Sequence, residues 1–297
     1  MFVGTGVALI TPFKKDMSID FDAYANVIEH VIEGGVDFLV PLGSTGETAT
    51  LNESESRKIL DFVIEVNKGR KPIVAGNFGG KNTLELVKKI KDYNFKGIDA
   101  ILSSSPEYVK PNQAGIYAHY MAMAEASSVP IILYNVPGRT KSNMEASTTV
   151  KLANASDKII AIKEATGDLI QTTRIIKDSP DDFLILSGDD EVTLPMIAVG
   201  GHGVISVMAN VYPKFFSQMA RFALDGEMDK ARQRNLETYD LHKWLYVEGN
   251  PVGIKTAMQH IGLCSNEVRL PLHQMSEENK SNLVECMKAT ESAHFVR

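Results

Sequence analysis

The clearest strand signal in this sequence is Lys158-Ile-Ile-Ala-Ile-Lys-Glu164. Its apolar centre is typical of a parallel strand that is buried on both faces. Similar short runs recur along the chain, and longer amphipathic segments separate them. The predicted strands are residues 4–10, 36–42, 72–77, 98–103, 129–135, 159–164, 183–187 and 203–207.

The segments between these runs read as helices with recognisable ends. Asp20 is suited to cap a helix that stops at Gly34-Gly35. Asn52, with Glu55 three residues later, forms a capping-box pattern at the start of the next helix. Strand–helix repeats with right-handed crossovers predict an α/β protein, a closed (β/α)8 TIM barrel. An open doubly wound sheet is the alternative, but no glycine-rich dinucleotide fingerprint follows the first strand.

The strand signal disappears after about Asp225, and helical patterns take its place. These helices are predicted over residues 227–247, 252–261 and 276–292. We therefore expect two regions, a barrel over residues 1–225 and a C-terminal helical region over residues 226–297 that packs on it. A role of this region in assembly is left open.

Composition excludes several classes of function. The 297-residue chain has 31 basic and 37 acidic residues and a formal net charge of −6, without a basic face for nucleic acid or a basic cluster for a membrane surface. Its most apolar stretch, residues 196–211, is broken by glycines and Asn210, and the N-terminus has no signal-peptide pattern, so we expect a cytoplasmic protein. Cys264 and Cys286 belong to no metal-binding pattern, and we expect neither a metal nor a cofactor.

Lys163 is the strongest candidate for chemistry, because catalytic groups of such barrels lie at the carboxyl ends of the strands. Strand alternation predicts that Lys163 shares a face with Ala161 and Ile159. If that face points into the barrel, burial disfavours the charged ammonium and makes the lysine a candidate nucleophile toward a ketone. The alternative is a lysine that reaches solvent or pairs with Glu164.

The fifth run ends in Tyr134-Asn-Val-Pro-Gly-Arg-Thr140. Tyr134 alternates with Ile132, so its phenol can point into the same barrel mouth and shuttle protons during imine formation. A Pro-Gly turn presents Arg139, whose planar guanidinium suits a carboxylate. A tyrosine at the edge of the core and a surface arginine are the alternatives.

The second run ends in Gly43-Ser-Thr-Gly-Glu47. The glycines allow a close approach to the backbone, and the hydroxyls of Ser44 and Thr45 can bind the carboxylate of an oxo acid. A phosphate-binding loop would need a lysine that is missing here. A plain turn is the alternative.

Three features carry weaker signals. Asp189 and Asp190, after Gly188, suggest a metal, but such a pair more often forms a polar loop or a helix cap. His202 lies between glycines and is interpreted as a turn residue, and Tyr108 lies in a proline-flanked loop. The lysine, the tyrosine, the hydroxyl pair and the arginine at the strand ends together predict a lyase or aldolase that works through an imine.

Three motifs resemble those of the dihydrodipicolinate synthase / N-acetylneuraminate lyase family. They are Gly43-Ser-Thr-Gly-Glu47, Tyr134-Asn-Val-Pro-Gly-Arg-Thr140 and Lys163-Glu-Ala165, and the likeness extends from Gly4 to the helical C-terminus. The resemblance implies that Lys163 forms an imine with pyruvate. It also implies a homotetramer built as a dimer of dimers.

The resemblance further implies roles for individual residues. Tyr134 would act as acid and base, linked through Thr45 to Tyr108 of the neighbouring subunit in a tight dimer. Ser44 stands where the synthases usually have threonine, and it keeps the hydroxyl. Thr45 and the backbone at Ile205 would lie near the pyruvate carboxylate.

The second substrate implied by the resemblance is L-aspartate-4-semialdehyde, with its carboxylate on Arg139 and with Gly188 and Asp189 nearby. Gly-Arg after Tyr-Asn-Val-Pro is typical of the synthases rather than of the sialic-acid lyases. It favours condensation to 4-hydroxy-tetrahydrodipicolinate, on the route to diaminopimelate and lysine. A pyruvate-dependent aldolase for a sugar-derived 2-oxo acid and a non-catalytic binding barrel stay as alternatives.

The chain departs from the family at a regulatory site. Lysine-inhibited members tend to carry two histidines, an asparagine and a tyrosine around an interface site, and Glu53, Ser56, Lys81 and Glu107 stand there in this chain, whereas Glu85 matches. A lysine ammonium would meet the like charge of Lys81, and the ring contact expected at position 107 is missing. We expect weak or absent feedback inhibition by L-lysine.

Overall fold

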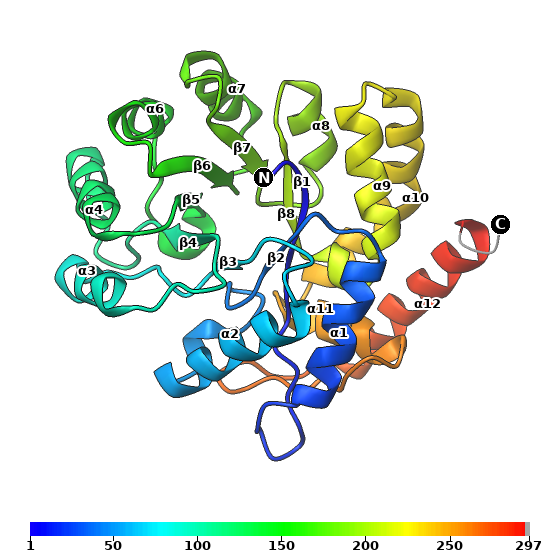
Figure 1. Ribbon diagram of the computed structural model, residues 1–297. Helices are drawn as coiled ribbons and strands as arrows, with labels where there is room; N and C mark the ends of the chain where they lie inside the picture. The colour runs from blue at the N-terminus through cyan, green and yellow to red at the C-terminus, as the bar shows by residue number, and fades with distance from the viewer. Residues whose placement is uncertain (295–297) are drawn as a thin grey trace.

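The computed structural model describes residues 1–294, and their strands and helices form the predicted (β/α)8 barrel (Figure 1). The strands are β1 Gly4–Ala8, β2 Phe38–Val40, β3 Val74–Ala75, β4 Ala100–Ser104, β5 Ile131–Asn135, β6 Ile159–Glu164, β7 Leu184–Ser187 and β8 Gly203–Ser206. They are parallel and pair in the order β2-β1-β8-β7-β6-β5-β4-β3. A parallel bridge between Leu39 and Ile73 joins the two ends of this order. Every predicted strand is confirmed, and the barrel closes.

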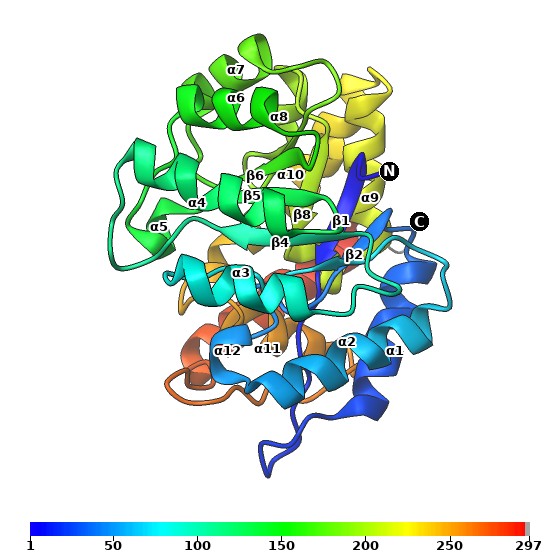
Figure 2. The ribbon, with the colours of Figure 1, turned by 60° about the vertical axis from the view of Figure 1, so that its left-hand side comes forward.

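Helices cover the outside of the barrel, and the first two begin where the sequence predicts (Figures 1 and 2). The side chain of Asp20 accepts a hydrogen bond from the N–H of Ala23 at the start of α1 (Phe21–Glu33). Asn52 and Glu55 form the predicted capping box of α2 (Glu53–Asn67). The other elements are α3 Thr83–Asp92, α4 Gln113–Ala126, α5 Pro137–Thr140, α6 Ala146–Ala155, α7 Leu169–Asp178, α8 Thr193–Ala198, α9 Pro213–Leu224, α10 Met228–Tyr246, α11 Val252–His260 and α12 Glu277–His294, with 3-10 turns η1 Thr48–Thr50 and η2 Met208–Asn210.

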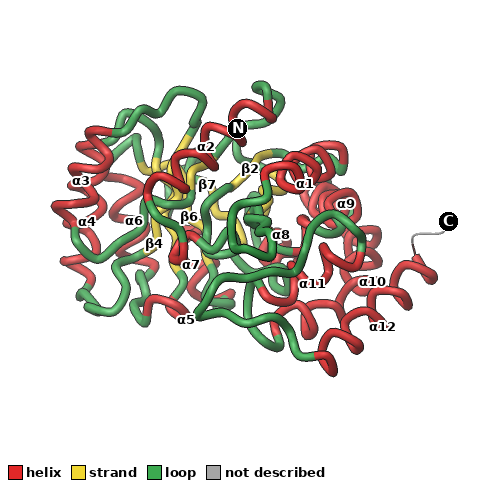
Figure 3. Tube along the Cα trace, turned by 90° about the horizontal axis from the view of Figure 1, so that it is seen from below, coloured by secondary structure: helices red, strands yellow, loops and turns green. Residues whose placement is uncertain are grey.

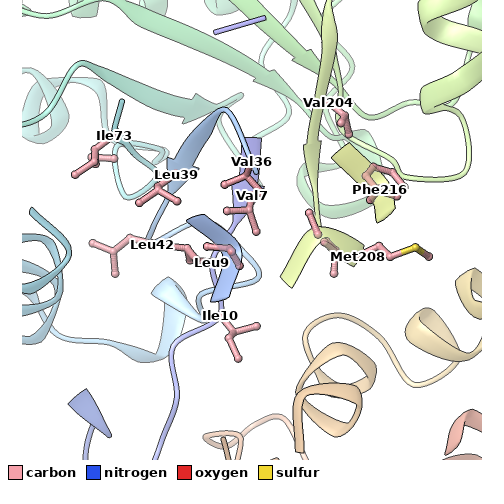
Figure 4. Close-up of a cluster of buried hydrophobic side chains, with 14 of the residues drawn as sticks. Val7, Leu9, Ile10, Val36, Leu39, Leu42, Ile73, Val204, Met208 and Phe216 are labelled. Atoms are coloured by element: carbon pink, nitrogen blue, oxygen red, sulfur yellow. The ribbon is translucent and has the colours of Figure 1, made fainter. Parts of the chain in front are cut away.

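The strands separate two layers of buried side chains. Alternate residues point into the barrel, where an inner cluster includes Ala8, Val40, Leu102, Ile132, Ala161, Leu186 and Ile205. The others point outward beneath the helices, and Figure 4 shows Val7, Leu39 and Val204 in this outer cluster together with Phe216 of α9. The barrel is therefore a packed core rather than a pore, and a cavity can open only at its ends.

One predicted orientation is wrong. Ile131 pairs with Ile159, but Ile132 pairs with Ala161, so the register between β5 and β6 shifts by one residue. Such a bulge adds a residue to one strand and reverses the alternation on one side of it. Ile159 is therefore buried in the outer cluster, whereas Ala161 lies in the inner cluster, and only Ala161 shares a face with Lys163.

The C-terminal helices are confirmed as α10, α11 and α12. Helix α12 lies against α10 and α11, away from the strands (Figures 1 and 3). Figures 1 and 2 place α11 below the strands, in the same part of the molecule as α1 and α2. Within residues 1–294, no helix combines the length and the apolar character that crossing a bilayer requires.

Candidate active site

A cavity of about 370 Å³ opens at the carboxyl ends of the strands, the end at which such barrels place their chemistry. Most of the predicted site residues line it. They are Ser44, Thr45, Tyr134, Arg139, Lys163, Gly188 and Asp189. The structure therefore brings together residues at the carboxyl ends of β5 and β6 and residues from the loops after β2, β5 and β7.

Lys163 lines this cavity with only 6% of its surface exposed. Its nearest neighbours across the sheet are Tyr134 on β5 and Leu186 on β7. The Nζ atom lies 4.5 Å from the centre of the Tyr134 ring. Within residues 1–294, no carboxylate lies within 4.0 Å of this nitrogen in an ion pair. The amine is thus open to the carbonyl group of a ligand.

Glu164 does not neutralise Lys163, because the two side chains point to opposite faces of β6. Glu164 is fully buried and accepts hydrogen bonds from Nδ2 of Asn135 (3.0 Å), from the N–H of Thr166 (2.8 Å) and from Nε2 of Gln171 (3.1 Å). Burial raises the pKa of this carboxyl, and these hydrogen bonds oppose the rise. The structure excludes both alternatives for Lys163, a solvent-exposed lysine and a partner of Glu164.

Gly188 makes room for the Lys163 side chain. A Cβ atom at position 188 would lie 3.1 Å from both Cε and Cγ of Lys163 and 2.6 Å from Cβ of Ala165. Asp189 follows directly and also lines the cavity. Burial raises the pKa of Asp189, and the charge of Asp190 adds to the rise, whereas His242 and Lys163 oppose it.

Asn250, which the sequence analysis did not select, joins two of the predicted groups. Its Nδ2 donates a hydrogen bond to Oγ1 of Thr45 (2.9 Å), and its backbone carbonyl accepts one from Nη2 of Arg139 (3.2 Å). Thr45 is almost fully buried, so this amide fixes the direction of its hydroxyl. The segment between α10 and α11 therefore positions both a hydroxyl and a guanidinium.

Helix α10 supplies a further wall of the cavity that the sequence analysis also missed. His242 and Tyr246, one helical turn apart, both line it. Neither ring nitrogen of His242 has a hydrogen-bond partner among the described residues, and burial lowers the pKa of this histidine. The spacing of four was visible in the sequence, but it does not tell which way a helix faces.

Asp190 forms part of a polar loop, which is what the sequence favours over a metal site for the Asp189-Asp190 pair. It is 1% exposed, and its Oδ2 accepts hydrogen bonds from the N–H groups of Val207 (3.0 Å) and Met208 (2.8 Å). His202 lies in the predicted turn before β8, where its Nδ1 accepts a hydrogen bond from the N–H of Ile185 (3.1 Å).

Two predicted site residues lie outside the cavity. Ile205 is buried in the inner cluster, two residues before Val207, which lines the cavity in its place. Tyr108 is 84% exposed, and its ring contacts only the ammonium of Lys81, at 5.7 Å, among the aromatic and cationic contacts of residues 1–294. Within one subunit, Tyr108 does not reach Thr45 or Tyr134.

The arrangement suits the capture of a 2-oxo acid. A little-exposed amine lies beside a phenol, and hydroxyls and a guanidinium face it across the cavity. An amine nucleophile of this kind forms a carbinolamine and then an imine with a ketone, and a nearby phenol can move the protons.

Comparison with known proteins agrees with this geometry. The model of the dihydrodipicolinate synthetase family matches residues 1–290. A 4-hydroxy-tetrahydrodipicolinate synthase of Flavobacterium psychrophilum is 47% identical over 95% of this chain and 96% of its own. The crystal structure of a dihydrodipicolinate synthase from Aquifex aeolicus superposes with a TM-score of 0.93 at 40% identity, covering 97% of this chain and 98% of that one. A monomeric dihydrodipicolinate synthase variant superposes with a TM-score of 0.94 at 34% identity, covering 97% of each chain. The chain belongs to the dihydrodipicolinate synthetase family.

Proposed function

We propose that this protein is a lyase that condenses pyruvate with L-aspartate-4-semialdehyde to give 4-hydroxy-tetrahydrodipicolinate, in diaminopimelate and lysine biosynthesis. The near full-length likeness to relatives named for this activity supports the reaction. One observation carries the choice of nucleophile. Lys163 lines the cavity, and its amine lies beside the Tyr134 ring without an acidic ion-pair partner within residues 1–294.

The proposed reaction begins with attack of the Lys163 amine on the keto carbon of pyruvate. Loss of water gives an imine, and loss of a proton from the methyl carbon gives an enamine that attacks the aldehyde. Tyr134 moves the protons, and the buried hydroxyl of Thr45, with Ser44, binds the pyruvate carboxylate. The amino group of the second substrate then displaces Lys163 and closes the ring.

Arg139 is the proposed clamp for the carboxylate of the second substrate, and Gly188 and Asp189 line the same part of the cavity. The guanidinium of Arg139 donates a hydrogen bond to the backbone carbonyl of Asn250, and Arg139 lines the cavity together with Lys163. A fork of this kind suits a small aldehyde acid, whereas a sugar-derived acid needs a surface rich in hydroxyl partners. The sugar-acid aldolase is therefore the less favoured alternative.

We also propose that Tyr108 completes the site of a neighbouring subunit in a tight dimer, and that two such dimers form a tetramer. Tyr108 is 84% exposed, and its backbone has a φ of 66°, a left-handed conformation that is uncommon for a residue with a side chain. Such strain is retained where a contact uses it. The likeness to a monomeric variant indicates that assembly differs within the family.

The test of the nucleophile is intact-protein mass spectrometry after incubation with pyruvate and sodium borohydride. Borohydride reduces the imine, so the wild type should gain one pyruvate-sized adduct and Lys163→Ala none. Lys158→Ala is the matched control, because Lys158 precedes the same strand and its Nζ lies by the carbonyl of Ser128. A folded wild type without adduct refutes the proposal. Turnover with aspartate semialdehyde then tests the second substrate.

Feedback inhibition by L-lysine should be weak or absent. This prediction rests on charge. The Lys81 ammonium lies 5.7 Å from the centre of the Tyr108 ring, and it would repel the ammonium of an L-lysine molecule bound beside it. Steady-state rates measured with rising L-lysine should stay near the uninhibited value. Potent inhibition would contradict the prediction.

A further inference from the structure

Tyr246 adds a second phenol to the cavity that Lys163 lines. It ends α10 and lines the cavity, and its hydroxyl oxygen lies 3.5 Å from Oδ2 of Asp190. Asp190 follows β7, which neighbours the Lys163 strand on the side opposite to Tyr134. Tyr134 therefore lies on the strand to one side of Lys163, and the Asp190–Tyr246 pair joins α10 to the loop that follows the strand on its other side.

Asp190 does not depend on the Tyr246 hydroxyl. Its Oδ2 already accepts the N–H groups of Val207 (3.0 Å) and Met208 (2.8 Å), which are shorter contacts than the one to Tyr246. A separation of 3.5 Å is at the long limit of a hydrogen bond. Rotation about one C–O bond can therefore turn the phenol hydrogen toward a ligand oxygen while Asp190 keeps its backbone donors.

The surroundings keep Tyr246 a neutral donor. Although 37% of the Tyr246 surface is exposed, burial raises the pKa of its phenol well above the ordinary value, and the charges of Asp190 and Asp189 add to the rise. A phenol with such a pKa does not give up its proton easily, but it still donates a hydrogen bond. Tyr246 is therefore suited to donate a hydrogen bond to an oxygen that gains negative charge, while another group supplies the proton.

The proposed reaction contains two carbonyl oxygens that change charge beside Lys163. The keto oxygen of pyruvate leaves as water, and Tyr134 is the proposed proton donor for that step. The aldehyde oxygen of the second substrate becomes a hydroxyl. Two phenols line the cavity with Lys163, and the proposed first half of the reaction uses only Tyr134.

We propose that the Tyr246 hydroxyl donates a hydrogen bond to the aldehyde oxygen of the second substrate and stabilises it during carbon–carbon bond formation. The inference rests on the proposed function. In this step the enamine carbon bonds to the aldehyde carbon, and the π pair of the C=O bond moves onto oxygen. The oxygen then takes a proton from Tyr134, while Tyr246 keeps its own.

The test compares Tyr246→Phe with Tyr239→Phe. Tyr239 lies two turns earlier on α10, is 47% exposed and lines a groove against α12 instead of this cavity. Tyr246→Phe should form the borohydride-trapped pyruvate adduct at the wild-type rate. Its kcat with aspartate semialdehyde should fall about 10- to 100-fold, the loss of one hydrogen bond to a charged oxygen. Its KM for the aldehyde should change little, because the contact strengthens in the transition state.

The outcomes separate the two proposals. An unchanged kcat in Tyr246→Phe, or an equal loss in Tyr239→Phe, overturns the inference. A Tyr246→Phe enzyme that also fails to trap pyruvate overturns it as well, because the hydroxyl would then serve the first half-reaction. Absence of the adduct in the wild type refutes the proposed function instead. Thermal unfolding of both variants checks that each is folded.

Discussion

Gly188 is the residue on which the freedom of the Lys163 side chain depends. A methyl group there would lie 3.1 Å from Cε and Cγ of Lys163. Gly188→Ala should therefore displace the amine and slow borohydride trapping of pyruvate roughly 100-fold, the loss that a small misplacement of a reacting group causes. Gly80→Ala is the control, since a Cβ at Gly80 meets no atom within 4 Å. Equal trapping rates for both variants would contradict this role of Gly188.

The sequence predicts single residues well where a strand end places them. Lys163, Tyr134 and Thr45 follow from alternation and from the ends of β6, β5 and β2, and all three line the cavity. Ile159 was assigned to the wrong face, because a bulge is a property of strand pairing and leaves no mark in one strand. Asn250 was missed because its partners are more than one hundred residues away in the chain.

At the scale of elements, a buried ion pair ties α11 to the turn after β2. The side chains of Lys255 and Glu47 are fully buried and hydrogen-bonded to each other. Lys255 also donates to the carbonyl of Glu267 (2.7 Å), and Glu47 accepts the N–H of Arg269 (3.0 Å). Burial lowers the pKa of Lys255, and Glu47 opposes that shift. The pair holds the turn that presents Ser44 and Thr45.

Removing one partner of this pair should be far more harmful than removing both. Lys255→Met leaves the Glu47 carboxylate buried without its ion-pair partner, and the free energy of unfolding should fall by about 3–5 kcal/mol. Adding Glu47→Gln to that variant should restore most of the loss, because no charge then stays buried. Urea denaturation of the single and double variants measures both values. A double variant as unstable as the single one would exclude this account.

The C-terminal helices were predicted as elements but not as part of the site. Amphipathic spacing gave their bounds to within a few residues. It did not show that α10 turns His242 and Tyr246 toward the cavity. The division of the chain at residue 225 thus separates the strands from helices that line the same cavity. We propose to treat the two regions as one catalytic unit.

At the scale of the whole molecule, the proposed dimer makes each site depend on two chains. Tyr108→Phe and Lys163→Ala homodimers should both be nearly inactive, one for lack of the partner hydroxyl and one for lack of the amine. Mixed and reassorted, they should regain about a quarter of wild-type activity, because half of randomly paired dimers contain one intact site. Activity measured before and after subunit exchange tests this. No recovery, with exchange shown by mass spectrometry, would place Tyr108 in its own subunit's site.

Asn250 contacts Thr45, and Lys255 and Arg269 contact Glu47, although all three come about 200 residues later in the chain. This order has a consequence for the synthesis of the protein on the ribosome. A ribosome releases the chain in sequence order, and its earlier parts begin to fold first. Lys163 therefore emerges well before the residues that fix Thr45 and Glu47. A chain that ends before Asn250 lacks both the amide donor to Thr45 and the ion-pair partner of Glu47, so we expect a prematurely terminated chain to bind pyruvate poorly even though it contains Lys163.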